Sequence, residues 1–245
     1  MKKILVVDNT IDKPHGSPEV CVHAQAAAGK FGEYSISVCR GPEAALPSRA
    51  EDYDAVILSG SKTRIFENAP WIEKELDFIR CLHEKQIPSL GICFGEQMMV
   101  RALTGSDWEE YTGASNISEY GWGKMELLEN ANLSSVFHSL PKEFYSYCMH
   151  SDEVYKTPKN FRATIKSADC PIQAFDILDA PMWGVQFHPE RSLEEGNKSL
   201  DAKKQKEPGV RILGREMAAN VFTVKIAQEI FTNFMKELWR SKGAA

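Results

Sequence analysis

Leu90-Gly91-Ile92-Cys93-Phe94-Gly95-Glu96-Gln97 is the stretch that constrains the fold most. Residues 87–92 have the composition of a buried strand, and residues 94–103 have that of a helix. Glycines stand two positions before and two positions after the cysteine between them. This spacing is typical of a sharp strand-to-helix turn, because side chains there would collide with the strand and the helix. Such a turn places Cys93 at a helix N-terminus, where the dipole favours a thiolate.

Strands and helices alternate through the first hundred residues, and this order predicts a parallel, doubly wound sheet. The predicted strands are 4–7, 34–39, 54–58 and 87–92, and the predicted helices are 18–30, 70–86 and 94–103. Later strands, with few helices between them, are predicted at 120–128, 161–166, 173–177 and 182–187. We therefore expect a single-domain α/β fold with a central, mostly parallel but mixed sheet flanked by helices.

The sequence contains no repeat and no long linker, so residues 1–245 are predicted to form one domain. The stretch 191–210 is polar and rich in Lys, Glu, Ser and Gly, which predicts an inserted loop that faces a partner or closes a site, or is a plain tolerated insertion. An amphipathic pattern over residues 215–239 predicts a C-terminal helix packed on the sheet.

Composition excludes several classes of function. The net charge of −5 gives no basic footprint for nucleic acid, and no apolar run is long enough to span a membrane. Six cysteines without a CxxC pair indicate free thiols in a reducing cytoplasm. The histidines show no ligand spacing and phosphate-loop motifs are missing, so we expect no metal, no cofactor and no ATP-driven step within this chain.

A second motif supplies a base for the cysteine. Trp183-Gly184-Val185-Gln186-Phe187 reads as a strand that ends in His188, and Glu190 follows across a proline. Residues two apart in an extended segment point to the same side, so Glu190 can reach the ring of His188. A cysteine, a histidine and an orienting carboxylate form the constellation needed for nucleophilic catalysis.

The two motifs together resemble the GxCxGxQ elbow and the GVQFHPE strand end of the class I (triad) glutamine amidotransferases, whose fold is flavodoxin-like. The resemblance covers about residues 54–188 and is greatest to the glutaminase portion of GMP synthetases and their stand-alone relatives. Glu119-Tyr120-Gly121 resembles the family's EYG segment, and Met149-His150-Ser151-Asp152 resembles its SHGD loop.

The resemblance implies a role for each matching position. Cys93 is the nucleophile, His188 the general base and then acid, and Glu190 the orienting carboxylate. The backbone amides of Phe94 and of the Gly60-Ser61 pair form the oxyanion hole. The amino-acid end of glutamine is held by Gln97, Met149, Ser151 and Asp152. The implied reaction is attack on the side-chain amide, release of ammonia and hydrolysis of a γ-glutamyl thioester.

The sequence departs from the family pattern at two of these positions. Ser61 stands where a second glycine is common. A serine can adopt fewer backbone dihedral angles than a glycine, which puts the geometry of the oxyanion hole in question. Ser151 replaces the glycine of the SHGD loop, which bears on the width of the substrate site.

Several functions stay open at this stage. The leading hypothesis is a glutaminase that supplies ammonia to a separate synthetase. The main rival is a stand-alone γ-glutamyl hydrolase or peptidase, a class in which Ser-Gly-Ser also occurs. A binding module with a dormant site is a third. A cysteine-dependent α/β-hydrolase fits less well, because its acid lies well upstream of the histidine. An alternative triad of Cys148, His150 and Asp152 lacks the elbow glycines.

Overall fold

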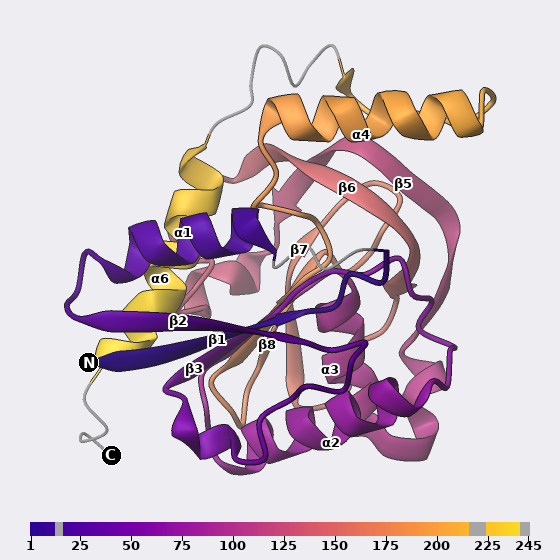
Figure 1. Ribbon diagram of the computed structural model, residues 1–245. Coiled ribbons are helices and arrows are strands. Elements are labelled where there is room, and N and C mark those ends of the chain that lie inside the picture. Colours follow the sequence, from indigo (N-terminus) through magenta and orange to yellow (C-terminus); the bar gives the residue numbers. More distant parts are fainter. Residues whose placement is uncertain (13–16, 216–223, 241–245) are drawn as a thin grey trace.

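A nine-stranded mixed sheet forms the centre of the computed structural model, which describes residues 1–12, 17–215 and 224–240 (Figure 1). The strands lie in the order β2-β1-β3-β4-β9-β8-β7-β5-β6. Their bounds are β1 Lys2–Asp8, β2 Tyr34–Arg40, β3 Ala55–Leu58, β4 Ser89–Ile92, β5 Thr112–Leu127, β6 Glu143–Val154, β7 Phe161–Lys166, β8 Ala174–Ile177 and β9 Met182–Val185. Pairing is parallel from β2 to β9 and antiparallel from β9 to β6, which confirms a mixed α/β sheet.

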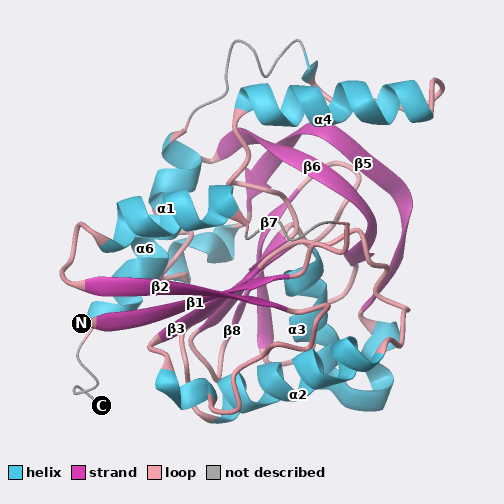
Figure 2. Ribbon diagram, viewed as in Figure 1, coloured by secondary structure: helices cyan, strands magenta, loops and turns pink. Residues whose placement is uncertain are grey.

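Helices cover both faces of the parallel half (Figure 2). The α-helices are α1 Pro18–Ala28, α2 Pro70–Glu84, α3 Phe94–Thr104, α4 Leu193–Lys206 and α6 Lys225–Trp239, and the short 3₁₀ helices are Ala50–Asp52, Gly105–Glu110 and Glu129–Leu133. Alternate β1 residues face opposite sides: Ile4 packs in the core with α1 and α6, and Leu5 in the core with α2 and α3. No helix among the described residues is long and apolar enough to cross a membrane.

The prediction of a loop at 191–210 is wrong, because most of this stretch forms helix α4. Ser192 caps the helix by accepting a bond from the backbone N–H of Glu195, whose carboxylate bonds back to the Ser192 N–H. Gly196 and Leu200 are the buried residues of α4. The stretch therefore lacks the broad apolar stripe by which helices are recognised.

The segment 149–154, expected as a loop, lies within strand β6, where it pairs with β5 across a register shift. The prediction for 215–239 is confirmed over α6, which buries a long apolar stripe on the sheet. Residues 216–223 of that prediction lie outside the described residues.

Candidate active site

Cys93 occupies the turn between β4 and α3, in the conformation that the elbow spacing predicts. Its backbone has φ 53° and ψ −108°, a strained combination for a residue with a side chain. A Cβ on Gly91 would lie 2.7 Å from the backbone of Gly95, and one on Gly95 would lie 2.4 Å from the carbonyl oxygen of Leu58. Both glycines are therefore required by close packing around the turn.

The chain after β9 brings His188 to the same edge of the sheet. The backbone N–H of His188 donates to the Tyr147 carbonyl at 2.7 Å, which fixes the segment against β6. The ring Nδ1 lies 2.7 Å from Oε1 of Glu190, and the Cys93 side chain lies close enough to act electrostatically on the ring. A Cβ on Gly60 would lie 2.8 Å from Cε1 of His188 and 3.4 Å from Cβ of Cys93. The structure thus brings together residues nearly a hundred positions apart.

Charges within this group favour a protonated ring. Burial acts to lower the pKa of His188, but the carboxylate of Glu190, the Cys93 sulfur and the hydrogen bonds to both outweigh it and raise that pKa to about 10. Burial acts to raise the pKa of Glu190, but the charge and hydrogen bond of His188 and the charge of Arg191 hold it below its usual value. The arrangement therefore stabilises an imidazolium beside the carboxylate of Glu190.

Cys93 is only 4% exposed, yet it lines a cavity of about 360 Å³. The wall of this cavity includes four of the predicted substrate-binding residues: Gln97, Met149, Ser151 and Asp152. Gln97 donates its side-chain N–H to the Asp152 carbonyl at 2.9 Å. Helix α4 contributes Ser199, Ala202, Lys203 and Lys206 to the same wall, which fits the alternative that the 191–210 stretch closes a site.

Arg64 is a site residue that sequence reasoning missed. Its guanidinium binds both carboxylate oxygens of Asp152, with distances of 2.5 to 2.9 Å, and the backbone N–H of Ile65 donates to the same carboxylate at 3.0 Å. Asp152 is 4% exposed, so this pair neutralises a buried charge at the cavity wall. Neither the elbow motif nor the strand-end motif could have revealed this contact, because Arg64 lies outside both and 88 positions from Asp152 in the sequence.

The predicted oxyanion residues lie around the thiol. Phe94 is the first residue of α3, so its N–H has no partner within the helix. Ser61 has no positive φ, so a serine in place of glycine imposes no strain there. Its hydroxyl instead bonds to the side chain and backbone N–H of Thr63, at 2.9 and 3.1 Å, and closes a small turn.

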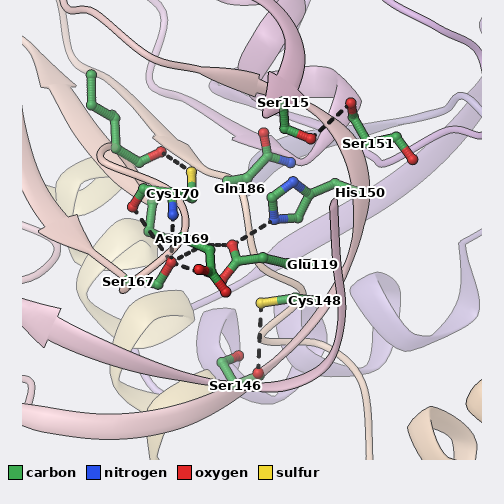
Figure 3. Close-up of polar contacts among 12 residues, drawn as sticks. Ser115, Glu119, Ser146, Cys148, His150, Ser151, Ser167, Asp169, Cys170 and Gln186 are labelled. Carbon is green, nitrogen blue, oxygen red and sulfur yellow. Dashed lines mark hydrogen bonds and ion pairs between the residues drawn. The ribbon is translucent and has the colours of Figure 1, made fainter. Parts of the chain in front are cut away.

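A second Cys-His-Glu group is formed by Glu119, Cys148 and His150, of which His150 lines the cavity (Figure 3). Nε2 of His150 lies 3.1 Å from Glu119, whose carboxylate also accepts bonds from Ser167 and Gln173. Burial, with the charge of Glu119, raises the pKa of the Cys148 thiol well above its usual value. Cys148 is fully buried within strand β6, so its thiol lacks the access that a nucleophile needs.

Comparison with known proteins identifies the family of the chain. The family model of class-I glutamine amidotransferases matches residues 21–206. The chain belongs to this family. A GMP synthase [glutamine-hydrolyzing] of Streptococcus mutans is 35% identical over 154 residues, which cover 62% of this chain but 28% of that protein. One subunit of the GMP synthase [glutamine-hydrolyzing] of Pyrococcus abyssi is 34% identical over 143 residues, 57% of this chain and 70% of the relative. The chain therefore spans less than a third of the long synthase.

Solved structures of similar proteins share the fold over the whole chain. A glutamine amidotransferase of Thermotoga maritima matches with a TM-score of 0.76 and 20% identity, covering 98% of this chain and 99% of that chain. One from Methylobacillus flagellatus matches with a TM-score of 0.78 and 18% identity, covering 100% and 98%. These likenesses support the α/β architecture of the amidotransferase.

Proposed function

We propose that the chain hydrolyses the side-chain amide of glutamine through a γ-glutamyl thioester on Cys93 and supplies the ammonia to a separate synthetase. The observation that carries the proposal is the juxtaposition of a strained elbow cysteine with a His188 ring held by Glu190 at 2.7 Å. The free thiols of the chain suit a reducing cytoplasm, where we place the reaction.

In the first half of the reaction, the Cys93 thiolate attacks the δ-carbon of the amide. Negative charge passes to the carbonyl oxygen, where the N–H of Phe94 and the backbone at Gly60 and Ser61 would stabilise it. The His188 imidazolium then gives its proton to the amide nitrogen, the C–N bond breaks, and ammonia leaves. Because the ring is already charged before substrate arrives, it acts first as the acid.

In the second half, neutral His188 takes a proton from water, and the resulting hydroxide adds to the thioester carbonyl. The C–S bond breaks, glutamate departs and the thiolate–imidazolium pair is restored. Glu190 keeps its charge throughout, because its role is to orient the ring and stabilise the imidazolium. The net change is glutamine plus water to glutamate plus ammonia.

A separate synthetase is proposed because the matched relatives in Pyrococcus and Methanococcus are each named as one subunit of a GMP synthase. Ammonia generated at Cys93 is useful chiefly when an acceptor site lies nearby. Partner binding should therefore raise the glutaminase rate of the chain.

The test is ammonia release from glutamine by the purified chain, alone and with candidate synthetase subunits. Cys93→Ala is expected to lose about ten-thousand-fold or more of the activity, whereas Cys81→Ala, a matched change on α2, keeps it. Rapid quenching and intact-mass measurement should reveal one γ-glutamyl group on the wild-type chain. Equal activity in wild type and Cys93→Ala would refute the proposal.

A second candidate function is hydrolysis of γ-glutamyl compounds. It is favoured by the space beside the imidazole of the dyad formed by His188 and Glu190. His188 and Glu190 line a separate cavity of about 190 Å³, which is far larger than ammonia requires and is also lined by Arg191. A substituted amine could leave through this space. Brisk partner-free hydrolysis of a γ-glutamyl dipeptide, with little turnover of glutamine, would favour this candidate over ammonia supply.

A further inference from the structure

Helix α4 is held over the cavity that contains Cys93. It begins at Leu193, soon after Glu190, and lies across β5 and β6 (Figure 1). A Cβ on Gly196 would lie 2.7 Å from the Trp122 ring, and Trp122 donates its indole N–H to Asn197 at 3.0 Å. Leu200 is fully buried against this anchor. The helix is therefore fixed on one side, while an adjacent stripe of side chains lines the cavity.

That stripe makes the cavity basic. Its wall carries four basic side chains, Lys62, Arg64, Lys203 and Lys206, against two carboxylates, those of Asp152 and Glu207. Arg64 is paired with Asp152, and Lys62 is paired with Asp12, so the surplus comes from the two α4 lysines set against Glu207. This positive surplus attracts the carboxylate group of a ligand. A substrate that lacks a carboxylate does not gain this attraction.

Lys203 is the α4 cation that reaches the amino-acid end of the cavity. Its Nζ lies 4.3 Å from the centroid of the Tyr120 ring, and the Tyr120 hydroxyl lies 2.5 Å from Oγ of Ser151. Ser151 precedes Asp152 on β6, so the ammonium stands beside the predicted amino-acid-binding residues of the cavity wall. Its ion pair with Glu207, at 2.6 Å, involves a carboxylate that is 56% exposed and thus contributes little. An ammonium has three donors, so Lys203 can bind a ligand without releasing Glu207.

We propose that Lys203 is a specificity-determining residue that binds the α-carboxylate of the substrate, so that helix α4 completes the substrate site. The inference rests on the proposed hydrolysis of a γ-glutamyl amide at Cys93. Within this site Lys203 faces the α-carboxylate from helix α4, and the Arg64–Asp152 pair lies in the same cavity wall. Neither elbow nor strand-end motif contains this residue.

The test compares L-glutamine with L-glutamine α-amide, which keeps the reacting amide but lacks the α-carboxylate charge. A charge-assisted hydrogen bond at this position gives wild type about a tenfold to hundredfold preference in kcat/KM for glutamine. Lys203→Gln should lose most of that preference, mainly through a higher KM for glutamine. Lys203→Arg should retain it, and Lys198→Gln, an exposed change on the same helix, should match wild type. Equal losses on both substrates, or no loss, would overturn the inference.

Binding measurements separate this inference from the proposed chemistry. In a Cys93→Ala background, calorimetry should show L-glutamine binding about tenfold or more tighter than its α-amide, and adding Lys203→Gln should remove the difference. If this binding preference is found but the wild-type chain shows no turnover, the proposed hydrolysis is refuted and the carboxylate site is supported. If turnover is normal but Lys203→Gln keeps the wild-type preference for glutamine over its α-amide, the carboxylate site is refuted and the proposed hydrolysis is supported. Failure of Cys93→Ala to bind L-glutamine would also overturn the inference.

Discussion

Replacing Glu190 with glutamine removes one negative charge from the dyad while keeping its shape. The amide oxygen can still accept a hydrogen bond from Nδ1 of His188, which lies 2.7 Å from the carboxylate oxygen of Glu190 in the unsubstituted protein. The pKa of His188 stands at about 10 instead of 6.5, which corresponds to about 5 kcal/mol in favour of the charged ring. The charge of Glu190 is the largest of the causes that raise this pKa, so we expect its loss to cost about 2 to 3 kcal/mol, or roughly a hundredfold in the protonation equilibrium.

The assay is the pH dependence of kcat/KM for glutamine, from pH 6 to beyond 10. Activity needs the protonated ring as acid, so the wild-type alkaline limb should lie near the pKa of His188, about 10. In Glu190→Gln this limb should move toward neutral pH, with a loss of about a hundredfold on the alkaline side and a smaller loss at pH 6.5. Glu194→Gln, an exposed change on α4, should leave the profile in place. Superposable profiles for Glu190→Gln and wild type would refute the charge argument.

The same dyad makes folding stability depend on pH. Because the folded-state pKa of His188 is raised, its contribution is fully present below 6.5 and is lost as pH rises through about 10. The pKa of Glu190 is lowered, so its contribution is present above its usual value and is lost as pH falls. Urea denaturation should therefore show a falling free energy of unfolding from pH 6.5 to 10, with a shallower slope in Glu190→Gln.

Three further changes test the surroundings of the site. Gly95→Ala places a Cβ 2.4 Å from a carbonyl oxygen of β3 and should cost about 3 kcal/mol or more in urea denaturation, whereas Gly209→Ala, in open space, should cost under about 0.5 kcal/mol. Arg64→Met leaves the carboxylate of Asp152 buried without its ion-pair partner. We expect the free energy of unfolding to fall by about 1 to 3 kcal/mol and the KM for glutamine to rise. Cys148→Ala should keep glutaminase activity, because that thiol belongs to the buried network, and a loss comparable to that of Cys93→Ala would reverse the assignment.

Local sequence rules accounted for the elbow and the strand end. The collisions expected at Gly91 and Gly95 occur in the structure, and Glu190 meets His188 across the proline as the extended spacing indicates. These features depend on residues within a few positions of one another, so their geometry follows from backbone sterics. Parallel strands were equally visible, because buried strands form continuous apolar runs.

The α/β architecture and the approach of His188 to Cys93 were therefore within reach of local sequence patterns. The residues that share the cavity with Cys93 came to light only in the folded chain. Arg64 meets Asp152 because two distant segments converge, and Lys203 reaches Tyr120 because a single buried leucine and a glycine contact dock an otherwise polar helix. Such contacts join residues some 80 positions apart through side chains that no local pattern marks. They depend on how the elements pack, and packing has no signature within either segment alone.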